Sequence, residues 1–146
     1  MSKSNACETD LLKLLFNNTT WAGVGDSTGI VGSGTAGSLF ISLHTADPGE
    51  TGDQTTSEIS YTGYARVAVA RSSGGWTISG NSVSPAATIS FGQMTAGTGG
   101  TVTHFGVGKS TSGAGELLYS GTVTPNISVT NGVTPQLTTA TAITED

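Results

Sequence analysis

The sequence contains a single cysteine, Cys7, so the chain cannot close a disulfide bond within itself. With one cysteine and two histidines, a zinc site built from these ligands is not expected. No apolar run approaches the ~20 residues that a transmembrane helix needs. Glu8 and Asp10 stand where a signal peptide would carry its apolar core. We therefore expect a chain that is made and folded in a reducing cytoplasm and has no membrane partner.

Charged residues are scarce as well. They make up 10% of the 146 residues, against about 25% in an ordinary soluble domain. Lys109 is the only charged residue between Ser72 and Gly115. The net charge is −5 and no basic cluster is present to neutralise phosphates, which argues against a nucleic-acid partner. Ser, Thr and Gly lose little side-chain entropy when immobilised, so such a surface can pack flat against a partner protein.

One helix is predicted near the N-terminus, over residues 8–16. Apolar side chains recur there at helical spacing, at Leu11, Leu12, Leu15 and Phe16. Ser4 or Thr9 could cap the helix, and Glu8 and Asp10 suit its first turn. A short amphipathic helix of this kind can cover a sheet or dock on a neighbouring subunit, and the sequence leaves both open.

The rest of the chain shows the alternation of short β-strands. Residues 23–37 are rich in Gly, Ser and Thr, which indicates a loop or mobile arm. The expected strands follow at residues 39–43, 64–71, 76–78, 89–91, 104–107, 117–120, 127–129 and 137–143. Turn residues separate them, and Asn131-Gly132 gives the strongest turn signal.

About eight short strands predict an all-β fold. We expect an antiparallel jelly roll or β-sandwich with one short N-terminal helix. A single domain would span residues 1–146, with the helix and the Gly-rich arm in 1–37 and the jelly-roll body in 38–146.

Two stretches contain the residue types of a cofactor or catalytic site but lack the secondary structure that such a site requires. Residues 32–37, GSGTAG, match the dinucleotide fingerprint, but a predicted strand follows where the mechanism requires a helix. His44 could be drawn into a triad with Asp47 and either Ser42 or Thr45, yet no serine occupies a strand-to-helix elbow. His44 and His104 are therefore expected to be ordinary sheet residues.

The acidic turn Asp47, Glu50 and Asp53 could hold a cation through carboxylate oxygens, but the EF-hand pattern is absent. We expect a solvated turn there. Overall the sequence predicts no catalytic residues, no cofactor-binding residues and no metal ligands, and the protein is not expected to be an enzyme.

The large aromatic residues are expected in the core, on a sheet face or as anchors at an interface. They are Trp21, Trp76, Tyr61, Tyr64 and Tyr119. Arg66 and Arg71 are the only arginines, and they flank one predicted strand. Both could pair with acidic residues of a partner.

Four stretches resemble a family of tailed-phage virion proteins described as tail-fibre or cement proteins. They are residues 8–19 (ETDLLKLLFNNT), 39–49 (LFISLHTADPG), 64–66 (YAR) and 115–122 (GELLYSGT). In size and pattern the chain is similar to jelly-roll cementing proteins of the Bordetella podovirus type. The Gly-rich segment before Leu39 departs from the commoner spacing of the family.

This resemblance implies a virion protein on the outer capsid surface, made in the host bacterial cytoplasm. Its implied partners are the major capsid protein and further copies of itself, in a homodimer or other small homo-oligomer. We therefore expect a cementing or decoration protein that binds the capsid shell and stabilises the mature head. The segment before about Asn18, or residues 23–37, would make the capsid contact. The alternative is a tail fibre or other tail component with a receptor-binding role, whose carbohydrate-binding form predicts exposed aromatic side chains.

Overall fold

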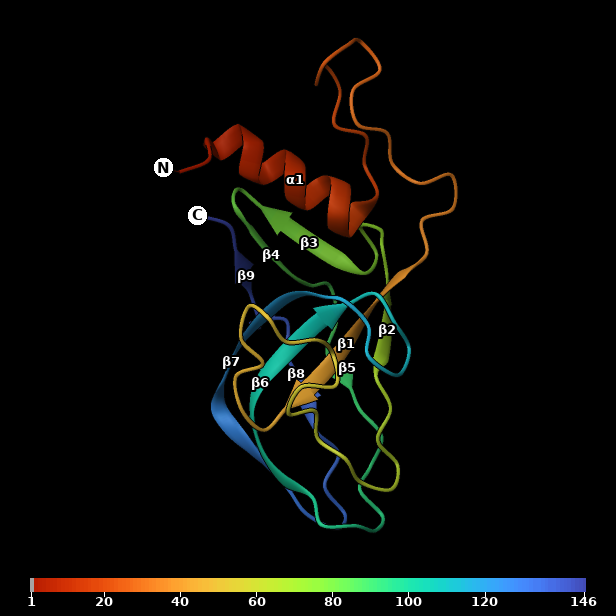
Figure 1. The fold of residues 1–146 in the computed structure, drawn as a ribbon, viewed down its shortest axis with the longest axis vertical. Helices are drawn as coiled ribbons and strands as arrows, with labels where there is room; N and C mark the ends of the chain where they lie inside the picture. Colours follow the sequence, from red (N-terminus) through yellow and green to blue (C-terminus); the bar gives the residue numbers. More distant parts are fainter. Residues whose placement is uncertain (1) are drawn as a thin grey trace. The chain divides into compact units, whose positions relative to one another are not determined.

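The computed structural model describes residues 2–146, and its contacts group the chain into two compact units (Figure 1). The helical unit comprises the N-terminal segment to Ser38 together with Val69–Thr88 and Thr138–Asp146. The sheet unit comprises Leu39–Ala68 and Ile89–Leu137. Two segments expected in the jelly-roll body thus group with the helix. That the chain forms a single domain stays a prediction.

The helical unit begins with α1 (Asn5–Asn17), which starts earlier and is longer than the helix predicted for residues 8–16. Of the two candidate caps, Ser4 is the N-cap, and its side chain accepts the Cys7 N–H. Thr9 lies inside the helix, where its hydroxyl oxygen is 2.8 Å from the carbonyl oxygens of both Asn5 and Gly80 and can donate its one proton to either. Within residues 2–146, α1 is too short and too polar to serve as a membrane span.

A small antiparallel sheet lies under this helix, in the order β3 (Trp76–Ser79), β4 (Ser82–Pro85) and β9 (Ile143–Thr144). Phe16 of α1 is fully buried and meets Trp76 of β3 edge to face, with ring centroids 4.8 Å apart. Edge-to-face contact is a favoured geometry for aromatic pairs. The helix therefore covers a sheet, the first of the two roles left open by the sequence.

Arg71 ties the end of α1 to the segment that follows it. Its guanidinium donates to the carbonyls of Leu14 (2.8 Å), Leu15 (2.6 Å) and Ala36 (3.2 Å). The last carbonyls of a helix have no intrahelical partner, and a cation there is also favoured by the helix dipole. Arg71 thus forms hydrogen bonds within the chain, and its pairing with a partner's acidic residues, which the sequence left open, stays a prediction.

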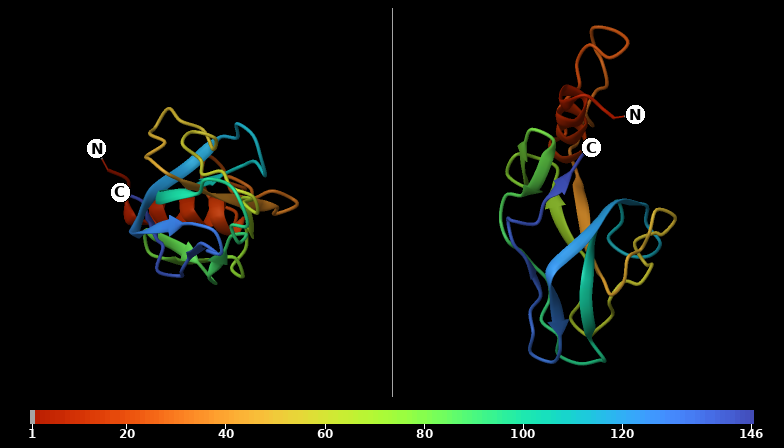
Figure 2. Two further views of the ribbon diagram at one scale, coloured as in Figure 1. Left: turned by 90° about the horizontal axis from the view of Figure 1, so that it is seen from below. Right: turned by 90° about the vertical axis from the view of Figure 1, so that its left-hand side faces the viewer.

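The sheet unit is built on a four-stranded sheet in the order β2 (Val67–Ala70), β1 (Ser38–His44), β6 (Gly100–Gly108) and β7 (Leu117–Val129). The β1–β6 and β6–β7 pairings are antiparallel, and β6 and β7 lie side by side in Figure 2. β1 begins at the last residue of the helical unit, and β2 ends in that unit. A two-stranded ribbon, β5 (Ile89–Ser90) with β8 (Gln136–Leu137), completes the sheet unit.

The fold class is confirmed: over residues 2–146 the structure is mostly antiparallel β with one short N-terminal helix, and the nine strands found there are consistent with a β-sandwich. Buried apolar side chains come from both the sheet strands and the loops beside them. In the sheet unit they include Ile41, Leu43, Phe91, Val102, Val107 and Val129, each at most 2% exposed.

Three strand predictions differ from the structure. The strands expected at 117–120 and 127–129 are one strand, β7, whose pairing with β6 shifts register between Val102 and His104. Pro125 lies in the stretch of β7 that this shift leaves unpaired with β6. The strand expected at 137–143 is divided into β8 and β9. β4 was not predicted, because Ser82-Val-Ser-Pro85 contains a single strongly apolar residue.

Replacing Phe16 by alanine tests the link between α1 and the small sheet. The change removes the ring packed on Trp76 and leaves a cavity, so we expect the free energy of unfolding to fall by about 3–5 kcal/mol. Denaturant titration followed by tryptophan fluorescence measures this. Lys13→Ala is the control, because the Lys13 side chain is 45% exposed and its loss should cost at most about 0.5 kcal/mol. Equal effects of the two substitutions would contradict the proposed packing role.

Candidate functional site

A long loop, residues 45–66, connects β1 to β2 in the sheet unit and carries most of the candidate residues. Backbone bonds fix it to the sheet: the Ile59 N–H donates to the Leu43 carbonyl (2.9 Å) and the Thr45 N–H to the Ser57 carbonyl (2.8 Å). The Gln54 N–H donates to the Gly115 carbonyl, at 2.9 Å. The loop is therefore held at several points along its length, despite lying outside the strands.

The strongest of these attachments is the ion pair between Glu58 and Arg66. Arg66 Nε and Nη2 each donate to one carboxylate oxygen of Glu58, both at 2.7 Å. The same guanidinium donates to the carbonyls of Ser110 (3.0 Å) and Gly113 (2.8 Å). Only 2% of the Arg66 side chain is exposed, and the hydrogen bond with Glu58 raises the pKa of Arg66. Arg66 is thus buried and hydrogen-bonded within the chain, to Glu58 and two backbone carbonyls, where the sequence had left a contact with a partner's acidic residues open.

Tyr64 extends the same network. Its hydroxyl donates to Glu58 Oε1 (2.8 Å) and accepts the Leu43 N–H (3.0 Å). Burial raises the pKa of Tyr64 well above its ordinary value, so the phenol keeps its proton. The Tyr64 ring also stacks on Phe91, with centroids 6.2 Å apart. Tyr64 and Tyr61 therefore act as sheet-face and core residues, one of the roles expected for the aromatic side chains.

Gln54 fills the space between the loop and the sheet. It is fully buried; its amide donates to the Phe40 carbonyl (3.3 Å) and its oxygen accepts the Ser110 N–H (2.9 Å). A β-carbon on Gly108 would come within 2.1 Å of Gln54 Cδ, so only glycine leaves room for this side chain. Neither Gln54 nor Glu58 was singled out from the sequence, because an isolated polar residue in a loop carries no pattern that predicts burial.

Ser42 and His44 do form a hydrogen bond, Oγ to Nε2 at 2.8 Å, as a catalytic pair would. The His44 Nδ1 lies 2.8 Å from the Thr56 carbonyl, which only accepts, so Nδ1 carries the proton and Nε2 accepts from the serine. Both side chains are fully buried. Asp47 and Thr45 do not join them in any hydrogen bond among residues 2–146. The pair therefore satisfies buried polar atoms beside the sheet core and offers no path to a substrate.

His104 lies opposite His44 in the β1–β6 pairing, and its Nδ1 is 2.9 Å from the Thr103 hydroxyl. The GSGTAG segment at residues 32–37 leads directly into β1. A strand therefore follows that motif, as the sequence indicated.

The acidic turn divides between two roles. Asp53 accepts the N–H and the hydroxyl of Thr55, at 2.7 and 2.6 Å, and these bonds lower its pKa. Asp47 accepts the Gly49 N–H at 2.9 Å. Within residues 2–146 no three His, Cys, Asp or Glu side chains gather as a metal site would require. The three carboxylates therefore do not converge on one point.

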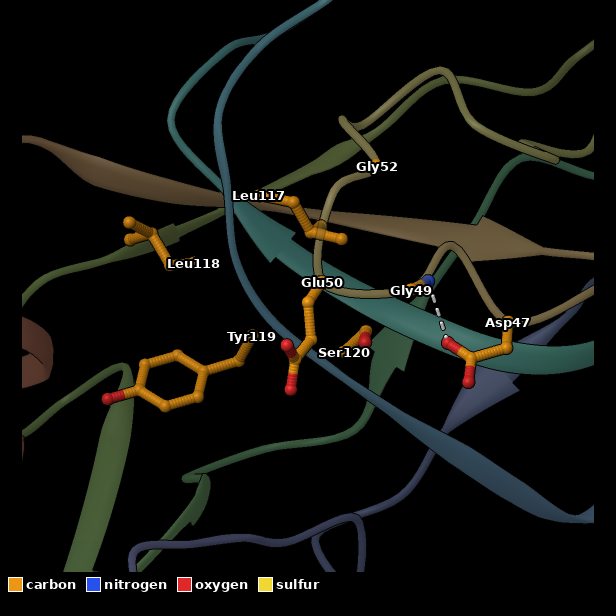
Figure 3. A pocket seen from close by; sticks show the side chains of 8 residues that line it. All are labelled: Asp47, Gly49, Glu50, Gly52, Leu117, Leu118, Tyr119 and Ser120. Atoms are coloured by element: carbon orange, nitrogen blue, oxygen red, sulfur yellow. Dashed lines mark hydrogen bonds between the residues drawn. The ribbon is translucent and has the colours of Figure 1, made fainter.

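Asp47 and Glu50 instead line a pocket of about 420 Å³ against the start of β7. Its other lining residues are Gly49, Gly52, Leu117, Leu118, Tyr119 and Ser120 (Figure 3). The acidic turn and Tyr119 were each singled out from the sequence, but nothing in it placed them together, because the pocket depends on how loop 45–66 folds back over the sheet. This pocket is the candidate ligand site of the chain.

A second candidate surface lies on the helical unit, in residues 23–37, which we call the arm. The arm extends away from α1 (Figures 1 and 2). A backbone bridge between Trp21 and Ile30 closes its first part, at 2.9 Å in both directions. Three large apolar side chains are exposed on it: Val24 (41%), Ile30 (42%) and Val31 (60%). Exposed apolar side chains gathered in one segment are typical of contact with another protein.

The burial of His44 predicts acid sensitivity. Burial lowers its pKa below 6.5, and this outweighs the nearby carboxylate of Glu58. Because the unfolded chain then binds the proton more readily, stability should be unaffected above the unfolded pKa and fall as pH drops below about 6.5, by up to about 1.4 kcal/mol per pH unit.

Denaturant titrations at pH 7.5 and 5.5 measure this effect. The wild-type protein should lose more stability over this range than His44→Gln. The control is His104→Gln, which should keep most of the wild-type pH dependence. If His104→Gln reduces the pH dependence of stability and His44→Gln does not, then His44 is not the source of the acid sensitivity.

Comparison with known families identifies relatives of the chain. The family model Gp80, described as podophage GP4 fiber I protein gp80, matches residues 2–144. No protein with a curated description matches the chain. The match supports the expected relation to phage structural proteins, although its name points to a fibre and not to a capsid cement. Because the matched region spans nearly the whole sequence, the chain belongs to the Gp80 family of podophage fiber I proteins.

Proposed function

We propose that this protein is a structural subunit of a fibre-type appendage on the phage particle, and that it works by binding other virion subunits without catalysing a reaction. The observation that carries the proposal is the family match over residues 2–144. The side chains support it. Arg66, Gln54 and the Ser42–His44 pair have their polar atoms engaged within the sheet unit. They stabilise the fold and are not presented to a substrate.

The arm is our proposed attachment element. It carries one charged residue, Asp26, whose carboxylate accepts the N–H groups of Thr28 (2.8 Å) and Gly29 (3.0 Å). These bonds fix the turn at its tip, so less entropy is lost when a partner immobilises it. Val24, Ile30 and Val31 would then be buried against a neighbouring virion subunit. Burial of side chains of this size contributes about 1.5–3 kcal/mol each.

A second candidate function is capsid cementing, in which the partner is the major capsid protein and the chain forms a small homo-oligomer on the outer shell. The long stretch of low charge between Ser72 and Gly115 favours this reading. A surface of Ser, Thr and Gly can lie flat against a shell at little entropic cost. The two functions differ in the number of equivalent sites that the particle offers.

The number of copies per virion distinguishes the two candidates. Quantitative mass spectrometry of purified particles measures this protein relative to the major capsid protein. A small number of copies, with antibody labelling at an appendage, is expected for a fibre subunit. A ratio near parity with labelling over the head would instead establish cementing and overturn the fibre proposal.

Attachment through the arm makes a separate prediction. Particles assembled with the triple variant Val24→Ser, Ile30→Ser and Val31→Ser should carry at least about tenfold fewer copies, because apolar contact area is lost. The purified variant should unfold at the wild-type denaturant concentration, since these side chains are exposed. Val31→Ile, which keeps the apolar surface, is the control and should attach normally. Wild-type incorporation of the triple variant would show that the arm is not the attachment element.

A further inference from the structure

The pocket beside β7 has a geometry that particle attachment does not explain. Its volume, about 420 Å³, falls in the range of small-molecule sites, about 300–1,000 Å³. One wall is the acidic turn and the other is the first four residues of β7, Leu117 to Ser120. Figure 3 shows Leu118 and Tyr119 on one side of the β7 ribbon and Leu117 and Ser120 on the other, with the carboxylate of Glu50 between Tyr119 and Ser120. Apolar surface and hydrogen-bonding groups are thus combined in one concave site.

The two carboxylates of the pocket point to different parts of it. In Figure 3, Glu50 reaches toward Tyr119 and Ser120, whereas the Asp47 carboxylate lies at the opposite end, bonded to the Gly49 N–H. Metal ions and ammonium groups are bound by ligands that converge on one point. Acceptors at both ends of a pocket suit a longer ligand with several hydroxyl groups.

The charge of the pocket also limits the ligand. No Lys, Arg or His is among its lining residues, and neither Asp47 nor Glu50 forms an ion pair within residues 2–146. A phosphate, sulfate or carboxylate group would therefore meet only like charge. Carboxylates accept hydrogen bonds from hydroxyl donors, and these charge-assisted bonds are about twice as strong as neutral ones. A neutral polyhydroxyl ligand fits this arrangement best.

The apolar wall provides the second half of the recognition. Tyr119, Leu117 and Leu118 are partly exposed and line the pocket together. Sugar rings have an apolar face of C–H groups, and an aromatic ring is a suitable surface for it. Tyr119 lies beside Glu50 in Figure 3, so a ring that rests on the tyrosine places its hydroxyls near a carboxylate.

The backbone of the polar wall and the side chain of Asp47 are held in place before any ligand binds. Asp47 bonds the Gly49 N–H, and the Gly52 N–H donates to the Gly49 carbonyl at 3.3 Å. Glycine at both positions lets a ligand approach the backbone closely. A site fixed in this way loses little entropy when it binds.

From these observations we propose that the pocket formed by Asp47, Glu50 and Tyr119 binds a neutral saccharide, a hexopyranose or short oligosaccharide. The sugar face packs on Tyr119, and its hydroxyls donate to Glu50 and Asp47. The proposal does not rest on the appendage function, because a subunit can be anchored to the particle without binding sugar. Copy number in virions and sugar binding therefore succeed or fail separately.

A glycan array probed with the full chain tests the proposal. The array carries neutral, amino and anionic oligosaccharides of bacterial and plant origin. Binding is expected to neutral glycans only, and calorimetry with the best free oligosaccharide then gives its affinity. Absence of binding to every neutral glycan, or a preference for anionic ones, would overturn the proposal.

Three variants assign the binding to this pocket. Tyr119→Leu keeps apolar bulk but removes the aromatic face, and should weaken binding about tenfold. Glu50→Gln keeps the shape and loses the charge, and should weaken binding several-fold. Asp10→Asn alters an exposed carboxylate on α1 and is the matched control, with no effect expected. Thermal unfolding verifies that each variant is folded, and wild-type affinity in a folded Tyr119→Leu protein would place the sugar elsewhere.

Discussion

The buried ion pair between Glu58 and Arg66 is the interaction on which the sheet unit depends. One guanidinium joins the loop between β1 and β2 to the carbonyls of Ser110 and Gly113, in the loop that precedes β7. Removing one partner of a buried pair leaves an uncompensated charge and costs about 3–5 kcal/mol. The first of these loops carries one wall of the pocket and the second leads directly into β7, which forms the other wall. The bonds that stabilise the fold therefore also connect the two segments that form the candidate ligand site.

Hydrogen bonds of other buried polar side chains also stabilise the sheet unit. Gln54, in the first of these loops, bonds Ser110 in the second, and the Ser42–His44 pair satisfies its polar atoms beside the core. The chain has few charges, and it places Arg66 and Arg71 where several backbone carbonyls need donors. Most of the surface is thereby left to Ser, Thr and Gly. Such a surface suits a protein that is packed among other subunits in a particle.

Local patterns in the sequence were sufficient for the fold class and several elements. Leu12 and Phe16 at helical spacing predicted α1, and alternation around Ile41 and Leu43 predicted β1. The continuity of β7 was missed because polar residues separate its two apolar ends. The pocket and the Glu58–Arg66 network were missed for a different reason. Both join residues that are distant in the sequence, and no periodicity encodes which loop folds over which strand.

The outer edge of β7 affects how readily a strand from another molecule could add to this sheet. β7 is the last strand of its sheet, and its pairing is interrupted around Pro125, a residue without a backbone N–H. An irregular edge that contains a proline is a poor template for another strand. β7 is therefore less able to join the sheet of a second molecule into a continuous aggregate. Contacts with a neighbouring protein are then left to side chains, which can specify one orientation.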